Sequence, residues 1–438
     1  MAMRVVMPCG SSVMEANLDW GHSLGSLDIA DVPGLTDLQT AYRRAVTQPI
    51  GFLSGLWDSF RPGETVAIVL SDAFRHTGMN QLLPFMLEDL FRAGIAEKDI
   101  LFIFATGTHR PPTQEEQARI VGADIFARFQ SQCIVHDPHD EACLLYVGET
   151  RRGTPVWTNQ QVYDCDRVIL TGAVVLHYFA GFGGGRKALL PGLAGAVSIA
   201  HNHALNLHPK ENRLNPAVRI GALDGNPVAE DMLEGAQLCK TDGIINTVLN
   251  RRGEIAGIFS GEMDAAHRAA ARFAWQCYAA PIRRCADLVI ASAGDAANFV
   301  QSHKALFNAS LAATPNGRIV LLAPAPEGLG GDKFDRWLAL KTREAIFTEL
   351  RKHAEINGQT ALSTIEKAPR TILVTDLSDS DVALIGARKA ASLDDALALA
   401  RTELRQTGVT DPTCYCMPSA SYTVPWMEGS EKNAGGTP

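Results

Sequence analysis

The chain has 438 residues, of which 46% are hydrophobic and 20% are charged, as in soluble globular proteins of two or three domains. Its formal net charge of -8 gives no general basic surface, so we expect no nucleic-acid partner. No segment approaches the ~20 uninterrupted apolar residues of a membrane span, and the first residues lack a signal-peptide core, so we expect a cytoplasmic protein without membrane contact.

Apolar runs and helical patterns alternate along the first part of the chain. The runs at residues 65–70, 100–105 and 167–170 are predicted to be buried strands. Residues 79–93 carry Leu, Phe and Met at helical spacing, and Thr113 precedes a predicted helix start in the next segment, 115–121. This alternation is typical of an α/β fold.

An Ala-rich helix is predicted over residues 262–278, and the strand–loop–helix rhythm then restarts after Pro281. Three further strands are expected in ADLVIASAG, GRIVLLAPAPEGLG and TILVTDLSD, which begin at residues 286, 317 and 371. The sequence therefore predicts two α/β domains with mostly parallel sheets.

We place the domain boundary near residues 275–285. The division is an N-terminal catalytic domain over residues 1–278 and a C-terminal α/β domain over 279–411, with the active site in the cleft between them. The segment 412–438 is expected to pack back on the first domain, and its polar end, EGSEKNAGGTP, is expected to be disordered.

Three polar clusters directly follow apolar runs of the first domain. SDAFRHTG follows VAIVL, ATGTHRPPT follows LFIF, and LTGAVVLHYFAGFGGGRK follows DRVI. Ligands of parallel α/β sheets bind beyond the carboxyl ends of the strands, where loops supply functional side chains. The chemistry-bearing residues of these clusters are expected to converge on one cleft: Asp72, Arg75, His109, His177 and Lys187.

The segment GFGGGRK, residues 181–187, has four glycines in five positions. Such a loop allows close backbone approach, and its amide groups can cradle an anion, with Gly184 and Gly185 at its centre. It is not a Walker loop, because Arg186 precedes Lys187 and Ala188 follows it. The alternative is a flexible turn that enters a helix.

Histidines offer two further kinds of chemistry. His201 and His203 form an HxH pair that could bind a transition metal. His109 and His177, from different loops, could flank a substrate as base and acid, since the ordinary pKa of histidine suits both roles at neutral pH. The guanidinium group of Arg75 could bind a substrate carboxylate through two parallel hydrogen bonds. For each histidine the alternative is a structural hydrogen bond.

In the second domain, NFVQSHKALFN brings Gln301, Ser302 and Lys304 together after a predicted strand. The segment is either the start of a helix with a polar face or a set of groups that face the cleft between the domains.

Together these clusters resemble the nickel-pincer lactate racemase family. The resemblance is carried by SDAFR at 71–75, TGTHRP at 106–111, HYFAGFGGGRKALLPGLAGAVSIAHNH at 177–203, QSHK at 301–304 and PSASYTVP near the C-terminus. The ten-residue step from His177 to Lys187 and the sixteen-residue step from Lys187 to His203 make the third motif the most specific of these.

The resemblance implies a nickel pincer nucleotide, pyridinium-3-thioamide-5-thiocarboxylic acid mononucleotide, tethered to Lys187, with His203 as the protein ligand of nickel. It implies a small 2-hydroxy acid as substrate and cofactor-biosynthesis proteins as partners. The cofactor-binding residues would be Lys187, Asp72, Gly184, Gly185 and Lys304, and the substrate-binding residues Arg75, Gln301, Ser302 and Lys304.

The implied reaction is racemisation or epimerisation of the 2-hydroxy acid. His109 and His177 would act as the catalytic acid and base while hydride passes to the cofactor and returns to the opposite face of a planar 2-keto acid. The chain departs from lactate racemase at Val300, where that enzyme has an aromatic residue, and INGQ at 356–359 holds no tryptophan. These departures put lactate itself in question as the substrate, and a smaller side chain at 300 would leave room for a larger one.

Two other functions fit parts of the pattern. A zinc-dependent metallohydrolase could use His177, His201 and His203, and would carry zinc with no added mass on Lys187. A non-catalytic ligand-binding homologue would keep the fold without cofactor or turnover. The presence of every expected catalytic residue argues against the second alternative. The sequence does not determine the oligomeric state.

Overall fold

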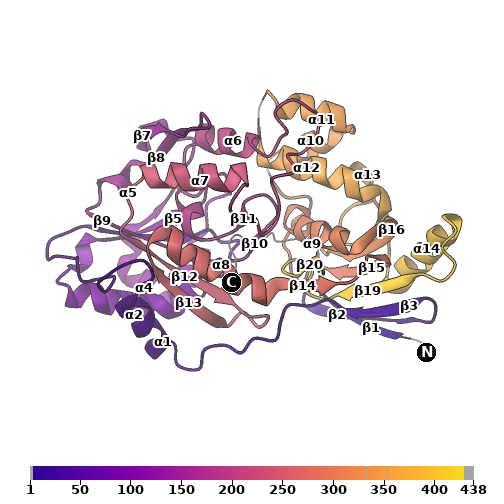
Figure 1. Cartoon of the computed structure of the whole chain (residues 1–438), viewed down its shortest axis with the longest axis horizontal. Helices are drawn as coiled ribbons and strands as arrows, with labels where there is room; N and C mark the ends of the chain where they lie inside the picture. The colour runs from indigo at the N-terminus through magenta and orange to yellow at the C-terminus, as the bar shows by residue number, and fades with distance from the viewer. Residues whose placement is uncertain (1–2, 332, 353, 429–438) are drawn as a thin grey trace. The chain divides into compact units, whose positions relative to one another are not determined.

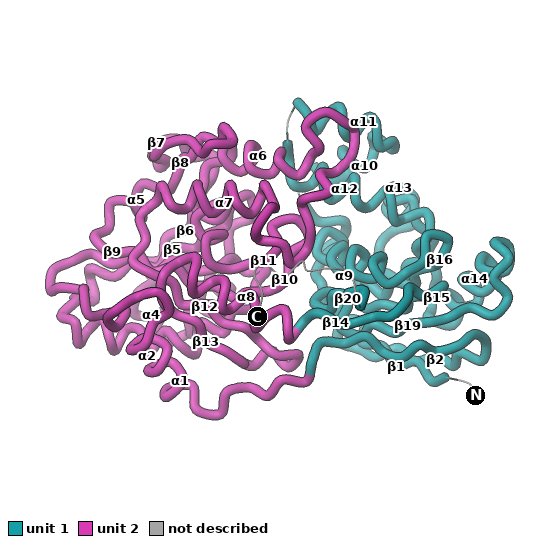
Figure 2. The backbone as a smooth tube through the Cα atoms, in the orientation of Figure 1, with its two compact units in different colours: residues 1–30, 278–432 teal, residues 31–277, 433–438 magenta. Residues whose placement is uncertain are grey.

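Apolar runs form the central strands of two sheets in the computed structural model, which describes residues 3–331, 333–352 and 354–428 (Figure 1). The chain divides into two compact units (Figure 2). Unit 2 comprises residues 31–277, and the described part of unit 1 comprises residues 3–30 and 278–428.

The sheet of unit 2 has the strand order β13-β12-β9-β4-β5-β6. Neighbouring strands run parallel except β13, which pairs antiparallel with β12 at one edge. The strands predicted at 65–70, 100–105 and 167–170 are confirmed as β4, β5 and β9. The bounds of the sheet are β4 Val66–Ser71, β5 Ile100–Ala105, β6 Cys133–Val135, β9 Arg167–Ala173, β12 Gly243–Leu249 and β13 Ile255–Gly261.

Helices cover both faces of this sheet, which is why β4 reads as a continuous apolar run rather than an alternating one. Val66, Ile68 and Leu70 pack with residues of α1 to α4, whereas Ala67 and Val69 pack with residues of α5, α7 and α8. The helices of unit 2 are α1 Leu38–Thr47, α2 Met79–Arg92, α3 Gln114–Val121, α4 Ala123–Phe129, α5 Gln160–Asp164, α6 Ala196–Ala204, α7 Pro227–Leu238 and α8 Met263–Tyr278.

The helix expected after Thr113 begins where its capping residue predicts. The Thr113 hydroxyl accepts from the amide of Glu116, and the Glu116 carboxylate accepts from the amide of Thr113, so α3 opens on a capping box. Short antiparallel pairs complete unit 2 beside the sheet: β7 Leu144–Glu149 with β8 Pro155–Asn159, and β10 Leu176–His177 with β11 Gly181–Phe182.

The sheet of unit 1 is parallel, with the order β18-β17-β16-β15-β19-β3. The strands predicted from 286, 317 and 371 are confirmed as β15, β16 and β17, and they are neighbours in this sheet. The bounds are β3 His22–Ser26, β15 Ala286–Ser292, β16 Ala313–Leu322, β17 Thr371–Val374, β18 Arg388–Ala390 and β19 Thr413–Met417. The expectation of an α/β fold with mostly parallel sheets is therefore correct.

One face of the unit 1 sheet packs on α14 and on the hairpin of β1 and β2, and α9 lies against β15 and β16. A further strand, β20, pairs parallel with β14. The remaining bounds are β1 Met3–Cys9, β2 Ser12–Leu18, β14 Ala279–Ile282, β20 Val424–Met427, α9 Phe299–Ala312, α10 Phe334–Ala339, α11 Arg343–Leu350, α12 Ile356–Lys367, α13 Asp379–Ile385 and α14 Leu393–Gln406.

The compact units differ from the expected division at both ends of the chain. We expected residues 1–278 in one domain and the segment from 412 onward packed against it. Instead β19 lies between β15 and β3 in the unit 1 sheet, so both termini contribute to that sheet. Parallel strands are joined by long crossover connections, so the local sequence pattern does not identify the partner of a strand. Residues 429–438, expected to be disordered, lie outside the described residues.

Candidate active site

The first group of functional side chains follows β4. Asp72 is buried, and its carboxylate oxygen Oδ1 accepts from the amide of Phe74 at 2.9 Å. Its other oxygen, Oδ2, lies 2.8 Å from Nδ1 of His109 and 3.4 Å from Nε of Arg75. Burial alone would raise the pKa of this carboxyl, but Arg75, His109 and the Phe74 amide together hold the pKa well below its usual range. Asp72 is therefore an anion at neutral pH.

His109 comes from the loop after β5 and meets Asp72 as the two strand ends predict. Because an ionised carboxylate only accepts hydrogen bonds, Nδ1 of His109 donates to Asp72. The lone pair of the neutral ring then lies on Nε2, as in a carboxylate-oriented general base. The ring of Phe74 packs edge-on against this imidazole at 5.6 Å between centroids, which further restricts its orientation.

His177, on β10, accepts hydrogen bonds at Nδ1, whereas His109 donates one from Nδ1. The amides of Phe179 and Ala180 donate to its Nδ1 at 3.4 and 3.3 Å. Since Nδ1 accepts, the neutral ring carries its proton on Nε2. In their neutral forms the two histidines therefore differ: His109 presents a lone pair at Nε2, and His177 presents an N–H there.

His203 lies in the last turn of α6 and is buried. Its Nδ1 donates to the carbonyl of Ile199 at 2.6 Å, one helical turn earlier, which leaves the lone pair on Nε2. Burial, followed by the charges of Lys187 and His109, lowers the pKa of His203 to about 4, although the hydrogen bond to Ile199 opposes this shift. The ring is neutral at physiological pH, as a metal ligand must be.

The ring of Phe179 joins three of the predicted side chains. Its centroid lies 4.4 Å from that of His177 and 4.9 Å from that of His203, and the amine Nζ of Lys187 lies 5.2 Å from it. The lysine and both imidazoles therefore surround one aromatic ring in unit 2. The sequence analysis missed Phe179, although its place directly after the HY of the third motif made it a candidate.

The glycine-rich segment is tightly packed rather than a flexible turn. The amide of Gly185 donates to Oδ1 of the buried Asn246 at 2.8 Å. Gly184 and Gly185 have φ values of 72° and 52°, which favour glycine. An ideal Cβ on Gly184 would lie 2.6 Å from that same Asn246 oxygen. Lys187 follows in a short 3-10 turn over Gly185–Ala188, so its backbone is fixed.

Two further residues that the sequence analysis missed support this segment. His267, buried on α8, donates from Nε2 to the carbonyl of Gly183 at 2.9 Å and receives Arg186 at Nδ1 at 3.3 Å. Arg186 is also buried and pairs with Asp264 at 3.2 Å. Burial and the charge of Arg186 lower the pKa of His267 to about 3, so the ring stays neutral and keeps both contacts.

Gly185→Ala is expected to lower the free energy of unfolding by about 1–3 kcal/mol, as measured by chemical denaturation. The new Cβ would meet Cδ2 of His267 at 2.6 Å, in addition to the strain of a φ of 52°. Gly63→Ala is the matched control, because Gly63 has a φ of 87° and nothing within 4 Å of its ideal Cβ. Equal losses in the two variants would show that the loop tolerates the added atom.

The residues predicted in the second domain lie on α9 in unit 1. Lys304 donates from Nζ to Oε1 of Gln301 at 3.2 Å. Ser302 is fully buried, and its hydroxyl donates to the carbonyl of Asn298 at 3.1 Å within the helix. These contacts are those of a helix start with a polar face, which was the structural alternative. The roles expected of the three residues stay predictions.

The zinc alternative requires His177, His201 and His203 to meet. On α6, however, His201 is exposed while His203 is buried. Within residues 3–331, 333–352 and 354–428, no three His, Cys, Asp or Glu side chains gather as a metal site would require. Histidines two apart on a helix point in different directions, so the HxH spacing does not make a chelate here.

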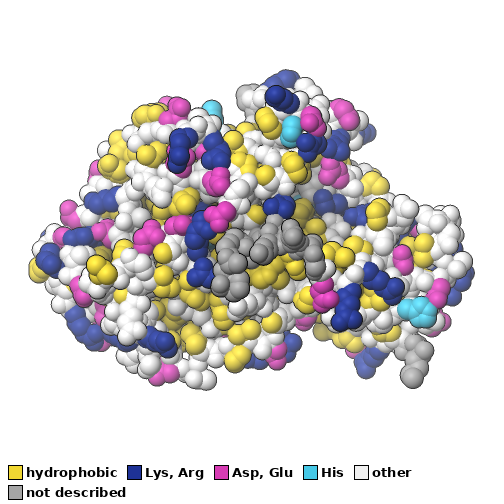
Figure 3. All heavy atoms as spheres, viewed as in Figure 1, with side chains coloured by type: hydrophobic (Ala, Val, Ile, Leu, Met, Phe, Trp, Pro, Cys, Tyr) yellow, Lys and Arg dark blue, Asp and Glu magenta, His cyan; other side chains and the backbone are white. Residues whose placement is uncertain are grey.

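Two further features concern membrane-spanning helices and the distribution of charged side chains. No helix in the described residues has the length and apolarity needed to cross a membrane. On the face shown in Figure 3, Lys and Arg side chains are interspersed with Asp and Glu side chains rather than gathered by sign.

The fold and the site define an α/β protein with an Asp–His pair after two neighbouring strands of one sheet, and with two further imidazoles and a lysine around one aromatic ring. The family model described as the lactate racemase N-terminal domain matches residues 9–214. Lactate racemase of Lactiplantibacillus plantarum is 31% identical over 304 residues, 69% of each chain. Lactate racemase of Thermoanaerobacterium thermosaccharolyticum is 30% identical over 298 residues, 67% of this chain and 68% of the relative. The chain belongs to the lactate racemase family.

Two solved structures share the fold. The lactate racemase apoprotein of Thermoanaerobacterium thermosaccharolyticum matches with a TM-score of 0.84 at 25% identity, over 97% of this chain and 100% of that one. A protein from Thermotoga maritima matches with a TM-score of 0.67 at 16% identity, over 89% and 98% of the two chains, and shows the fold alone. The relationship supports a racemase function, and hence an isomerase.

Proposed function

We propose that the protein is a nickel-dependent racemase or epimerase of a 2-hydroxy acid. The observation that carries the proposal is the convergence of Lys187, His177 and His203 on the ring of Phe179. The Asp72–His109 pair follows β4 and β5, which are neighbouring strands of the sheet in the same unit. These residues carry the motifs that resemble the nickel-pincer lactate racemases.

The residues present fit a nickel pincer nucleotide. Its ring would be tethered to Nζ of Lys187, and Nε2 of His203 would complete the nickel ligands, because that ring is neutral and its Nδ1 is held by Ile199. The backbone at Gly184 and Gly185, whose Gly185 amide is itself held by Asn246, and the side chains of Asp72 and Lys304 are the further proposed cofactor contacts. When bound, the cofactor would supply a reversible acceptor for the hydride at C2 of the substrate.

The chain's own residues would handle the carboxylate and the protons. Arg75, held by Asp72 and partly exposed, would bind the substrate carboxylate. Nε2 of His109 would take the proton of the substrate hydroxyl, and Asp72 would stabilise the imidazolium that forms. The Nε2–H of His177 would donate a hydrogen bond to the oxygen when it lies on the other side. Removing the proton as the C2–H bond breaks gives a planar 2-keto acid, which has no handedness at C2.

The experiment is expression together with the cofactor-making proteins, which are the partners we propose. Bound nickel and intact mass are measured first, and single enantiomers of lactate and of longer 2-hydroxy acids are then screened by chiral chromatography. We expect nickel, an added mass, and conversion of at least one acid into its stereoisomer. Zinc with unmodified mass, or a loaded protein that converts none of the acids, would contradict the proposal.

The control for the nickel site is His203→Ala against His201→Ala. His203 is buried beside Phe179, whereas His201 is exposed on the same helix. Nickel should be lost from the first variant and kept in the second. Loss of nickel from His201→Ala alone would show that His201, rather than His203, binds the metal.

A further inference from the structure

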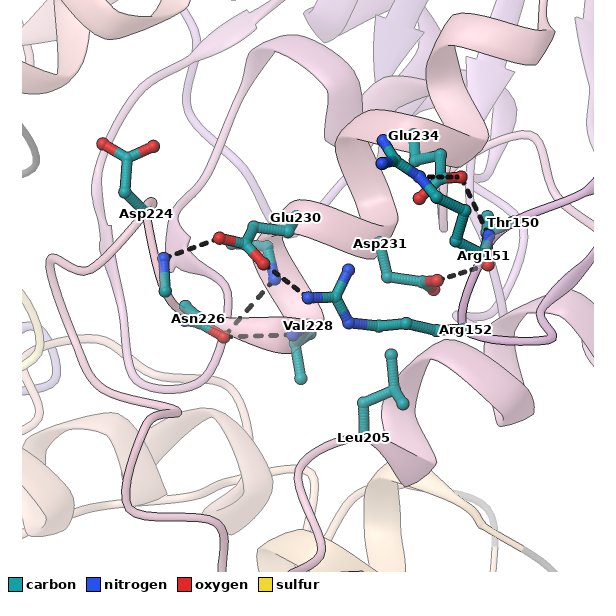
Figure 4. Close-up of polar contacts among 12 residues, drawn as sticks. Thr150, Arg151, Arg152, Leu205, Asp224, Asn226, Val228, Glu230, Asp231 and Glu234 are labelled. Carbon is teal, nitrogen blue, oxygen red and sulfur yellow. Dashed lines mark hydrogen bonds and ion pairs between the residues drawn. The ribbon is translucent and has the colours of Figure 1, made fainter.

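Helix α7 supports the ring that joins the proposed site. Its N-cap residue, Asn226, is buried, and its side-chain oxygen accepts from the amides of Val228 and Ala229 (Figure 4). The amide nitrogen of the same side chain donates to the carbonyl of Phe179 at 2.8 Å. The residue that begins α7 therefore also fixes the backbone of the aromatic ring packed between Lys187, His177 and His203.

Asp231, within the same helix, is fully buried and is held by neutral donors. Its Oδ1 accepts from the hydroxyl of Thr150 at 2.5 Å, as Figure 4 shows, and its Oδ2 accepts from the hydroxyl of Thr154 at 2.8 Å. Oδ2 also accepts from the side-chain amide of Asn202 at 2.9 Å. A buried carboxylate is stable only when its oxygens are hydrogen-bonded, so these donors and Asp231 depend on one another.

Asn202 connects this hydrogen-bond network to His203, the proposed nickel ligand. It is fully buried on α6, directly before His203, and its amide also donates to the carbonyl of Val228 on α7 at 3.1 Å. The imidazole of His203 is fixed to α6 through its hydrogen bond to Ile199. Any shift of α6 relative to α7 would therefore move Nε2 of His203 with it.

We propose that Asn202 of α6 and Asp231 of α7 are positioning residues, which hold α6 against α7 so that His203 stays where it can bind nickel. This inference rests on the proposed function only in taking His203 as the ligand. The partners of metal-bound histidines commonly set metal affinity, and their loss costs about 10–100-fold. Here the supporting hydrogen bonds do not contact His203 itself but act through α6, the helix that carries it.

The test uses Asn202→Ala and Asp231→Asn, with Glu234→Gln as the matched control. Asn202→Ala removes the link to α6 and leaves Asp231 its two threonine hydroxyls, so it tests the idea even if Asp231→Asn fails to fold. Glu234 lies on the same helix, where its carboxylate pairs with Arg151 at the surface (Figure 4). The cofactor-loaded proteins are challenged with a chelator, and nickel release and the nickel absorption band are followed.

Nickel should leave Asn202→Ala and Asp231→Asn about 10-fold faster than the unaltered protein, with a shifted absorption band, while Glu234→Gln behaves as the unaltered protein does. Hydrogen exchange of the cofactor-free proteins should show faster exchange of the α6 amides in the first two variants only. Unchanged nickel release and unchanged α6 exchange in Asn202→Ala would overturn the inference. If instead His203→Ala holds nickel as well as the unaltered protein, the proposed function fails, whatever α7 does.

Discussion

Lys187→Ala is expected to reduce the racemisation rate by at least about 10⁴-fold, because the amine is the proposed attachment point of the group that carries the difficult step. Nζ of Lys187 lies over the ring that also contacts His177 and His203, and its backbone is fixed in the turn that follows the glycines. The variant should also lose the added mass and the nickel. Intact mass, metal content and chiral conversion measure the three effects on the same preparation.

Lys98→Ala is the control for this variant. Lys98 has a side chain that is 84% exposed and contacts only the neighbouring Asp99 among the ion pairs of the described residues. Its replacement should change neither mass nor rate. A Lys187→Ala protein with full activity would rule out the tether, and one that keeps the added mass would place the attachment on another residue.

Asp72→Asn is expected to lower kcat by about 10³–10⁴-fold with a smaller effect on KM. The carboxylate accepts from Nδ1 of His109 and so leaves the lone pair on Nε2. An asparagine can turn its amide to Nδ1 instead, which would put the proton on Nε2 and remove the base. Steady-state kinetics, with Asp124→Asn at the exposed start of α4 as the control, measure the difference. An unchanged kcat would exclude His109 as the base.

The same variant gives a pH test of stability. The native pKa of Asp72 is depressed, so the ion contributes its full stabilisation above the unfolded pKa near ~3.9 and loses it as the pH falls toward the native value. The free energy of unfolding of the unaltered protein should therefore exceed that of Asp72→Asn by less at pH 3 than at pH 6. A constant difference would mean that the charge of Asp72 does not stabilise the fold.

Much of the fold was predictable because the central strands are buried on both faces. The runs that form β4, β5 and β9 contain almost only apolar residues, and the polar clusters after them lie where parallel strands end. This is why Asp72 and His109, 37 residues apart, could be expected to meet. The edges of the unit 1 sheet could not be predicted. The segment HSLGS of β3 is polar and mostly exposed, and it pairs with β19 nearly 400 residues away.

The sequence singled out the reactive side chains of the site but not the residues that support them. Lys187 and His203, which the third motif singled out, lie around one ring, whereas the residues that hold them come from elsewhere in the chain. Asn246, His267 and Asp231 are each single polar residues within apolar or helical segments, and nothing local separates them from ordinary core polar groups. Their roles follow from long-range hydrogen bonds to Gly185, Gly183 and Asn202.

The reaction path can be followed with a 2-hydroxy acid that the screen identifies, prepared as one enantiomer with deuterium at C2 and converted in ordinary water. Transfer of that hydrogen as hydride to a bound acceptor and back keeps it away from solvent, so the opposite stereoisomer should retain the deuterium at C2. Mass spectrometry of the separated product reads this directly. A product that carries solvent hydrogen at C2 from the first turnovers would contradict hydride transfer and would require removal of that hydrogen as a proton.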